Sequence, residues 1–323
     1  MNVESGMQRR RIVAVVGVCV AFACVGGAGA ERESMLEMSE LVPDVAALEK
    51  VATGFKFVEG PTWLPEKKAF VFSDIPADTQ YVIGRGADGK WGKAEVFLTP
   101  SRNANGTTID VEGRLLVCRH GARDLIRIEK DGTQTVLATH FEDKRLNSPN
   151  DVIVAADGAV YFTDPPWGLG KNDKKELDHE SVYRLSPDGK ELTKVAGEMK
   201  APNGLALSPD GKTMYVAESW WQVKPQFISA YDVKPDGSLG EPRPFFTVEK
   251  GTPDGMRVDE RGNVWTTAGE GILIVDPSGK LIGTIPVPES PANLTFGGED
   301  GKTLFVTART SVYAIRVGVT AAK

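Results

Sequence analysis

The sequence predicts an all-β protein folded as a six-bladed β-propeller, and three observations lead to this prediction. The 323 residues include 35 Gly and 20 Pro without a triplet period, which indicates many turns and excludes collagen and helix bundles. A unit of two short apolar strands, the first with a polar start, recurs six times at spacings of 40 to 54 residues. Most units continue into two further strands around a turn, as propeller blades do.

Residues 1–30 are expected to be a secretory signal peptide rather than part of the fold. Arg9-Arg10-Arg11 precedes a mostly apolar stretch over residues 12–25, and Ala28-Gly29-Ala30 is a small-residue cleavage site. An uncleaved membrane anchor is the alternative, although the stretch is short for a membrane span. We therefore expect an exported protein, either periplasmic or secreted.

Cleavage after Ala30 changes the composition of the chain. The formal net charge of −6 becomes −8, because the removed segment carries three Arg and one Glu. Cys118 is then the only remaining cysteine, so no intrachain disulfide can form. An exported protein without disulfides must be stabilised by its core or by a bound metal.

Residues 31–323 are expected to form one propeller domain. A short helix is expected within residues 34–50. The sixth unit ends early, with a strand over residues 311–317. A strand near residues 50–57 would complete that last sheet and close the ring, which removes exposed sheet edges.

The six units between these ends share one pattern. Each second strand carries an apolar or β-branched marker residue, namely Phe72, Val117, Phe162, Val216, Thr266 and Val306. Outer strands are expected in segments such as 125–137 and 181–195. The longest interval contains extra residues near 165–180, which we expect to form a loop with Trp167 facing a ligand and with its charged part in solvent.

The polar residue that starts each unit predicts a metal site. These residues are Glu59, Asn105, Asn150, Asn203, Asp254 and Asn293, each 12 or 13 residues before its marker. Equivalent positions at the start of inner strands converge on one mouth of the central channel. Carboxylate and amide oxygens without thiolate or imidazole suit a hard cation such as Ca²⁺. The alternative is a role in turns, since Asn-Gly and Asp-Gly pairs, here at residues 105, 203 and 254, are common turn signals.

These units resemble the gluconolactonase family, also called the SMP-30/regucalcin family. The matching stretches span residues 59–298 and are Glu59–Trp63, Arg145–Asp151, Tyr161–Pro166, Pro202–Leu205, Pro253–Met256 and Leu294–Gly298. The resemblance implies a six-bladed propeller with a central metal-binding channel. It also implies that Glu59, Asn150, Asn203 and Asp254 are the metal ligands and that Asp254 is the catalytic general base.

Four further residues are candidates for substrate binding. Asn105 and Asn293 occupy the remaining blade positions and are expected to line the same pocket. His120 follows the second strand of the second unit, where strand ends face the pocket, but a surface-loop or structurally hydrogen-bonded His is an equal alternative. Arg145 could reach a substrate oxygen, or it could form an ordinary ion pair between blades.

The resulting hypothesis is an exported, Ca²⁺-dependent hydrolase that opens sugar lactones. Zn²⁺ and Mg²⁺ are the alternative cations. A hydrolase of phosphoesters or other lactones on the same platform is the second hypothesis, and a non-catalytic protein-binding propeller is the third. The acidic excess argues against nucleic acid and anionic membrane surfaces as partners. The expected partner is a small lactone, with no membrane contact beyond the signal peptide and no prediction of oligomeric state.

Overall fold

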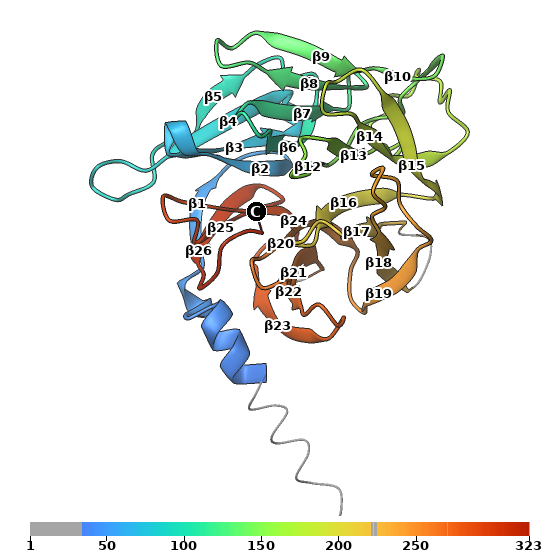
Figure 1. The fold of residues 1–323 in the computed structure, drawn as a ribbon. Helices are drawn as coiled ribbons and strands as arrows, with labels where there is room; N and C mark the ends of the chain where they lie inside the picture. The colour runs from blue at the N-terminus through green and yellow to red at the C-terminus, as the bar shows by residue number, and fades with distance from the viewer. Residues whose placement is uncertain (1–33, 221, 223–224, 270, 323) are drawn as a thin grey trace, which may run out of the picture.

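Six four-stranded antiparallel sheets form the blades of a β-propeller (Figure 1). The computed structural model describes residues 34–220, 222, 225–269 and 271–322. The innermost strands contact one another in sequence order, and the last of them contacts the first, so the ring is closed. The predicted all-β, six-bladed fold is therefore confirmed.

The first three blades follow one another along the chain. The first contains β2 (Val58–Leu64), β3 (Ala69–Asp74), β4 (Thr79–Gly84) and β5 (Glu95–Leu98). The second contains β6 (Ala104–Ile109), β7 (Leu115–Arg119), β8 (Asp124–Ile128) and β9 (Gln134–Ala138). The third contains β12 (Val152–Val154), β13 (Val160–Thr163), β14 (Glu180–Leu185) and β15 (Leu192–Met199). A small hairpin of β10 (His140–Phe141) and β11 (Lys144–Arg145) lies between the second and third blades in the sequence.

The next two blades repeat this order. The fourth contains β16 (Pro202–Leu207), β17 (Thr213–Glu218), β18 (Gln226–Asp232) and β19 (Arg243–Val248). The fifth contains β20 (Pro253–Val258), β21 (Val264–Ala268), β22 (Gly271–Val275) and β23 (Leu281–Pro286). Single-turn 3₁₀ helices occur at η1 (Val45–Ala47), η2 (Pro65–Lys67) and η3 (Ile75–Ala77).

The sixth blade joins the two ends of the chain. It contains β24 (Pro291–Gly297), β25 (Thr303–Ala308), β26 (Ser311–Arg316) and, as its outer strand, β1 (Glu49–Thr53). Thr53 of β1 pairs with Ser311 of β26, and Glu49 pairs with Ala314. The predicted closing strand is thus confirmed, and the backbone groups of β26 gain hydrogen-bonding partners.

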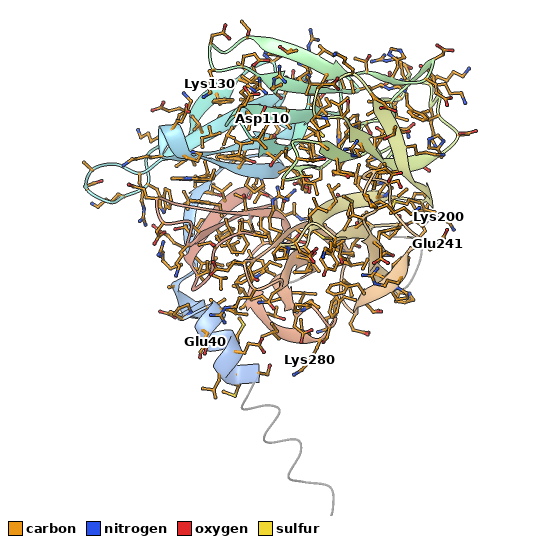
Figure 2. The ribbon with its side chains drawn as sticks, in the orientation of Figure 1. Glu40, Asp110, Lys130, Lys200, Glu241 and Lys280 are labelled. Atoms are coloured by element: carbon orange, nitrogen blue, oxygen red, sulfur yellow. The ribbon has the colours of Figure 1, made fainter. Side chains whose placement is uncertain are left out.

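The apolar core is divided among the interfaces of adjacent blades. Phe162 and Tyr183 of the third blade pack against Leu116 and Leu125 of the second, and comparable clusters fill the other interfaces. Charged side chains such as Lys130 and Lys280 lie on the outside of the ring (Figure 2). Cys118 is fully buried and free, so it packs as a small apolar residue.

An N-terminal helix packs against the fifth and sixth blades. Residues 34–41 are helical, which confirms the predicted short helix (Figure 1). Leu41 and Val42 at its end are buried in the cluster that also contains Trp265 and Val317. The Gly318 N–H donates to the Leu41 carbonyl at 2.9 Å. The helix therefore ties the N-terminal segment to the closing blade.

We expect Leu41→Ala to lower the free energy of unfolding by about 2–5 kcal/mol, because it leaves a cavity in a fully buried cluster. Leu36→Ala on the same helix is the matched control, since 59% of Leu36 is exposed. The control is expected to stay within about 0.5 kcal/mol of wild type. Denaturant unfolding of both variants measures the difference. Equal stabilities would contradict a structural role for the helix.

The predicted signal peptide, residues 1–30, lies outside the described residues. Among the residues that are described, none belongs to a helix long and apolar enough to cross a membrane.

Candidate functional site

The innermost strands deform at the residues that were predicted to form the site. In five of the six innermost strands the pairing register shifts beside the site residue, for example between Glu59 and Thr62 and between Pro253 and Met256. In the third blade, Asn150 instead precedes β12 and its N–H donates to the Thr163 carbonyl at 2.8 Å. Such bulges re-aim a side chain that a regular strand would direct into a blade interface.

The innermost strands also approach each other too closely for ordinary side chains. A Cβ added at Gly60 would lie 2.0 Å from the backbone oxygen of Asn105 in the next blade. A Cβ added at Gly204 would lie 2.1 Å from the backbone oxygen of Asp254. The Gly that follows a site residue therefore lets the next blade bring its own site residue close to the axis.

Five of the six predicted oxygen side chains line one pocket, which we call the channel pocket. Its volume is about 340 Å³, within the range of small-ligand sites. Its lining residues are Phe57, Glu59, Ile75, Asn105, His120, Asn150, Trp167, Asn203, Ser219, Thr252 and Asp254. The structure thus brings together residues that the sequence analysis aligned only by their equal spacing in the six repeated units.

The two carboxyl groups of the channel pocket, the buried Glu59 and the half-buried Asp254, lack an ion-pair partner among the described residues. Glu59 is 5% exposed, and among the described residues neither Glu59 nor Asp254 forms an ion pair with Lys, Arg or His. Burial raises the pKa of Glu59 to about 8. Burial and the nearby charges of Glu59 and Asp151 raise the pKa of Asp254 well above its ordinary value. The protein alone therefore disfavours the ionised form of both groups.

Neighbouring amides hold these two carboxyl groups. Glu59 accepts a hydrogen bond from the Gly60 N–H at 3.0 Å and another from the side chain of Asn293. Asp254 is hydrogen-bonded by the side chain of Asn203. These bonds lower the pKa of each carboxyl, but not enough to offset burial. The described side chains therefore do not supply enough positive charge or hydrogen bonding to favour the ionised form of either carboxyl group.

Asn105 and His120 form a neutral polar wall of the channel pocket. As placed, Asn105 Nδ2 donates to His120 Nε2 at 3.1 Å, which leaves the ring proton on Nδ1. Burial lowers the pKa of His120 to about 4, so the ring is neutral near pH 7. A Cβ added at Gly168 would lie 2.4 Å from His120 Cβ, so the predicted loop that carries Trp167 presses directly on this ring.

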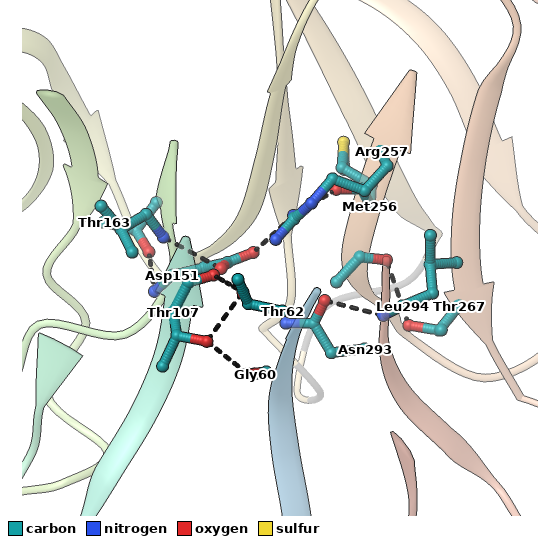
Figure 3. A network of polar contacts seen from close by, with 12 residues as sticks. Gly60, Thr62, Thr107, Asp151, Thr163, Met256, Arg257, Thr267, Asn293 and Leu294 are labelled. Carbon is teal, nitrogen blue, oxygen red and sulfur yellow. Dashed lines mark hydrogen bonds and ion pairs between the residues drawn. The ribbon is translucent and has the colours of Figure 1, made fainter. Parts of the chain in front are cut away.

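A third acidic side chain, the buried Asp151, belongs to the polar network around Arg257 and Asn293 that Figure 3 shows. Asp151 Oδ2 lies 3.7 Å from Arg257 Nη1, while Oδ1 accepts the Val152 N–H at 2.9 Å. Arg257 Nη1 also donates to the Met256 carbonyl at 2.7 Å. Arg257 also lines a second pocket of about 520 Å³. The C-terminal parts of several innermost strands line this second pocket as well. The Asp151–Arg257 pair therefore separates two pockets along the channel.

Two predicted substrate-binding residues lie outside the lining of the channel pocket. Arg145 donates through Nη2 to the Ala122 carbonyl at 2.8 Å, and its N–H donates to Glu176 Oε2 at 2.9 Å. Asn293 Oδ1 accepts the Leu294 N–H at 2.8 Å, and its side chain also bonds Glu59 and Asp151. Asn293 therefore orients Glu59, while contact of either residue with substrate stays a prediction.

Several lining residues were not among the predicted site residues. Phe57 directly precedes β2, and Ile75 is the first residue of η3, directly after β3. Thr252 directly precedes β20, and Ser219 lies near the start of that strand. The Ser219 hydroxyl donates to the Pro253 carbonyl, next to Asp254. Ser219 directly follows the last residue of β17, so its place just beyond a second strand was the signal that could have identified it.

The metal prediction depends on amides as much as on carboxylates. Among the described residues, no three His, Cys, Asp or Glu side chains gather as a metal-binding group. The predicted ligand set contains only two acids, Glu59 and Asp254, and its other members are Asn150 and Asn203. Oxygen donors of these two kinds, including two carboxyl groups without an ion-pair partner among the described residues, fit a hard divalent cation.

Comparisons with known proteins agree with this fold and show the family of the chain. A family model described as the SMP-30/gluconolactonase/LRE-like region matches residues 43–310. A gluconolactonase from Zymomonas mobilis is 33% identical over 298 residues, which cover 83% of this chain and 81% of the relative. The structure of a Xanthomonas campestris gluconolactonase is 37% identical, with a TM-score of 0.78 over 87% of this chain and 92% of that one.

A more distant structure shares the fold alone. It is regucalcin from Agrobacterium tumefaciens, described as a calcium-binding protein, with 22% identity. Its TM-score is 0.67, over 87% of this chain and 94% of that protein.

Proposed function

The chain belongs to the SMP-30/gluconolactonase/LRE-like family, and from this premise we propose that it hydrolyses the ring ester of sugar lactones with a divalent cation, Ca²⁺ first, in the channel pocket. One observation carries the proposal. Equivalent side-chain oxygens from five blades line a single pocket, in which the buried Glu59 and the half-buried Asp254 form no ion pair with any described Lys, Arg or His. A protein-binding propeller has no need of that arrangement, which costs stability unless a cation compensates it.

Glu59, Asn150, Asn203 and Asp254 would hold the cation. When bound, it would supply positive charge that polarises the lactone carbonyl and stabilises the negative charge that develops on its oxygen. The two carboxylates would match the charge of a divalent ion. Mg²⁺ fits less well, because it favours a tight octahedron with several waters.

The remaining steps belong to side chains of the pocket. Asp254 accepts a proton from the attacking water, whose oxygen bonds to the carbonyl carbon. The ring C–O bond then breaks, and its oxygen takes up that proton to give the open hydroxy acid. The Asn105 side chain and the neutral His120 ring offer hydrogen bonds to sugar hydroxyls.

The direct test is hydrolysis of a lactone panel that includes glucono-1,5-lactone, followed by proton release with Ca²⁺ or with EDTA. We expect turnover with Ca²⁺ and its loss in EDTA. Parallel assays with Zn²⁺ or Mg²⁺ in place of Ca²⁺ show which cation supports activity. Assays with phosphoester substrates test the second hypothesis, a hydrolase of phosphoesters. Absence of hydrolysis in every arm, together with an EDTA-insensitive melting temperature, would favour the protein-binding hypothesis.

The raised pKa of Glu59 predicts how the stabilisation of the protein by bound Ca²⁺ changes with pH. In the metal-free fold the pKa of Glu59 lies near 8, against an ordinary value of 4.5. Between these values the unfolded chain is ionised while the fold retains the proton, so metal-free stability falls as pH rises. Bound Ca²⁺ removes this penalty. We therefore expect the Ca²⁺-induced rise in Tm to be about 3 °C or more larger at pH 8 than at pH 5.

The control for this prediction is Glu59→Gln, which removes one titrating group from the pocket. Its metal-free Tm should fall less steeply between pH 5 and pH 8 than that of wild type. A Ca²⁺-induced shift of the same size at both pH values in wild type would contradict the role of these carboxyl groups.

We also propose that residues 1–30 direct export to the periplasm or the medium, on the basis of their charge and hydropathy pattern. Mass spectrometry of the protein from the extracytoplasmic fraction tests this, with a mature N-terminus at Glu31 as the expected result. Retention of an intact N-terminus in a membrane fraction would favour the anchor instead.

A further inference from the structure

Three acidic side chains occupy equivalent places at the ends of second strands. Asp74 is the last residue of β3, Glu218 is the last residue of β17, and Asp164 directly follows β13. Asp74 is 2% exposed, Asp164 is fully buried and Glu218 is half-buried. None of them lines the channel pocket, so the proposed chemistry does not use them.

Two of these carboxyl groups accept paired backbone hydrogen bonds. Asp74 Oδ2 accepts the Lys56 N–H at 2.9 Å, and Oδ1 accepts the Phe57 N–H at 3.1 Å. Asp164 Oδ2 accepts the Asn147 N–H at 2.7 Å, and Oδ1 accepts the Ser148 N–H at 2.7 Å. Each carboxyl group therefore fixes two consecutive peptide units.

The third carboxyl group repeats the pattern more loosely. Glu218 Oε2 lies 3.4 Å from the Lys200 N–H, and the Ala201 N–H also bonds this carboxyl group. In the three blades, the bonded N–H groups lie three and two residues before Glu59, Asn150 and Asn203 respectively. These are three of the four proposed metal ligands.

The other blades lack this arrangement. In the second blade, whose site residue Asn105 is not a proposed ligand, the second strand ends at Arg119. There the Asn103 N–H bonds Asp78 Oδ1 of the preceding blade at 2.7 Å. The second strands of the fifth and sixth blades end at Ala268 and Ala308. Each acidic strand end thus lies in a blade that carries a proposed metal ligand, although the fifth blade, which carries the proposed ligand Asp254, has none.

We propose that Asp74, Asp164 and Glu218 form a carboxylate clamp that positions three metal ligands by holding the backbone just before them. The inference rests on the proposed function, because it concerns the same metal. A carboxylate accepts hydrogen bonds from both N–H groups at once. An amide accepts only one, because its NH₂ group is a donor and repels the second N–H group. Outer hydrogen bonds of this kind typically change metal affinity by about 10–100-fold.

The decisive variant is Asp164→Asn, compared with Asp157→Asn in the same blade. Asp157 is exposed at 59% of its side chain and accepts one backbone N–H, from Ala159 at 2.9 Å. Calorimetric titration with Ca²⁺ at 25 °C, far below unfolding, measures affinity, and amide hydrogen exchange reports on residues 147 and 148. We expect Asp164→Asn to bind Ca²⁺ about 10–100-fold more weakly and to exchange faster there, and the control to match wild type.

The outcomes separate the clamp from the rest of the fold and from the proposed function. A folded Asp164→Asn protein with wild-type Ca²⁺ affinity would overturn the clamp, even if its Tm is lower. If this variant does not fold, Glu218→Gln decides, with a severalfold weaker affinity expected and an unchanged one contradicting the clamp. Wild-type protein that binds none of Ca²⁺, Zn²⁺ and Mg²⁺ would contradict the proposed function itself. In that case, unchanged exchange at residues 147 and 148 in Asp164→Asn would also overturn the clamp.

Discussion

When Asp254 is replaced by asparagine, we expect the protein to fold and its kcat for lactone hydrolysis to fall by a factor of about 10²–10⁴. Asn has the shape of Asp but cannot accept the proton of the attacking water at neutral pH. The fold should tolerate the change, because burial already makes the ionised form of Asp254 unfavourable. Removal of that charge therefore takes away a catalytic group without exposing a core.

The measurement must distinguish loss of the base from loss of the metal. Initial rates at rising Ca²⁺ concentrations should approach a low plateau for Asp254→Asn, because added metal cannot restore a proton acceptor. Glu59→Gln should instead recover activity as Ca²⁺ rises, since it weakens binding without removing the base. Asp236→Asn, in an exposed hairpin where Asp236 Oδ1 bonds the Ser238 N–H at 2.9 Å, is the neutral control. A plateau for Asp254→Asn within twofold of wild type would contradict its assigned role.

The second large effect is expected at Gly204. A Cβ at this position would lie 2.1 Å from the Asp254 carbonyl oxygen and 2.9 Å from Gly255 Cα, and both atoms are backbone. A flexible side chain could move aside, but two closely packed innermost strands cannot do so without opening the ring. We expect Gly204→Ala to cost about 3 kcal/mol or more of unfolding free energy, or to prevent folding.

Gly197→Ala provides the matched control, because a Cβ there would meet nothing within 4 Å. This control is expected to stay within about 0.5 kcal/mol of wild type. Denaturant unfolding compares the two variants, and Ca²⁺ titration of any folded Gly204→Ala protein reports on the channel. A Gly204→Ala protein as stable as the control would show that the innermost strands tolerate separation.

The repeat made much of this protein predictable. A marker residue in each second strand and a polar residue 12 or 13 positions earlier were enough to align six blades. Five of the six aligned polar residues, Asn293 being the exception, do line one pocket. The closing strand was predictable for the same reason, since an incomplete sixth unit requires a partner from elsewhere in the chain.

Side-chain direction within the site was less predictable. Asn293 holds Glu59 instead of lining the channel pocket, and the guanidinium of Arg145 bonds the Ala122 carbonyl. Neither contact can be recognised from the sequence next to the residue. Five of the six innermost strands bulge near their site residues, and a register change of one residue turns a strand side chain to the opposite face.

The sequence by itself determined the number of blades, the closing strand and the set of oxygen-bearing residues at the channel, because each follows from a repeated spacing. Only the tertiary structure decided which charges stay uncompensated. Within the described part of the chain, Glu59 and Asp254 form no ion pair, whereas Asp151 pairs with Arg257, more than 100 residues away in the sequence. That difference depends on which blades meet across the channel. The spacing of residues along the chain shows which residues occupy equivalent positions in different blades. Contacts between side chains of different blades across the axis form only when the ring closes.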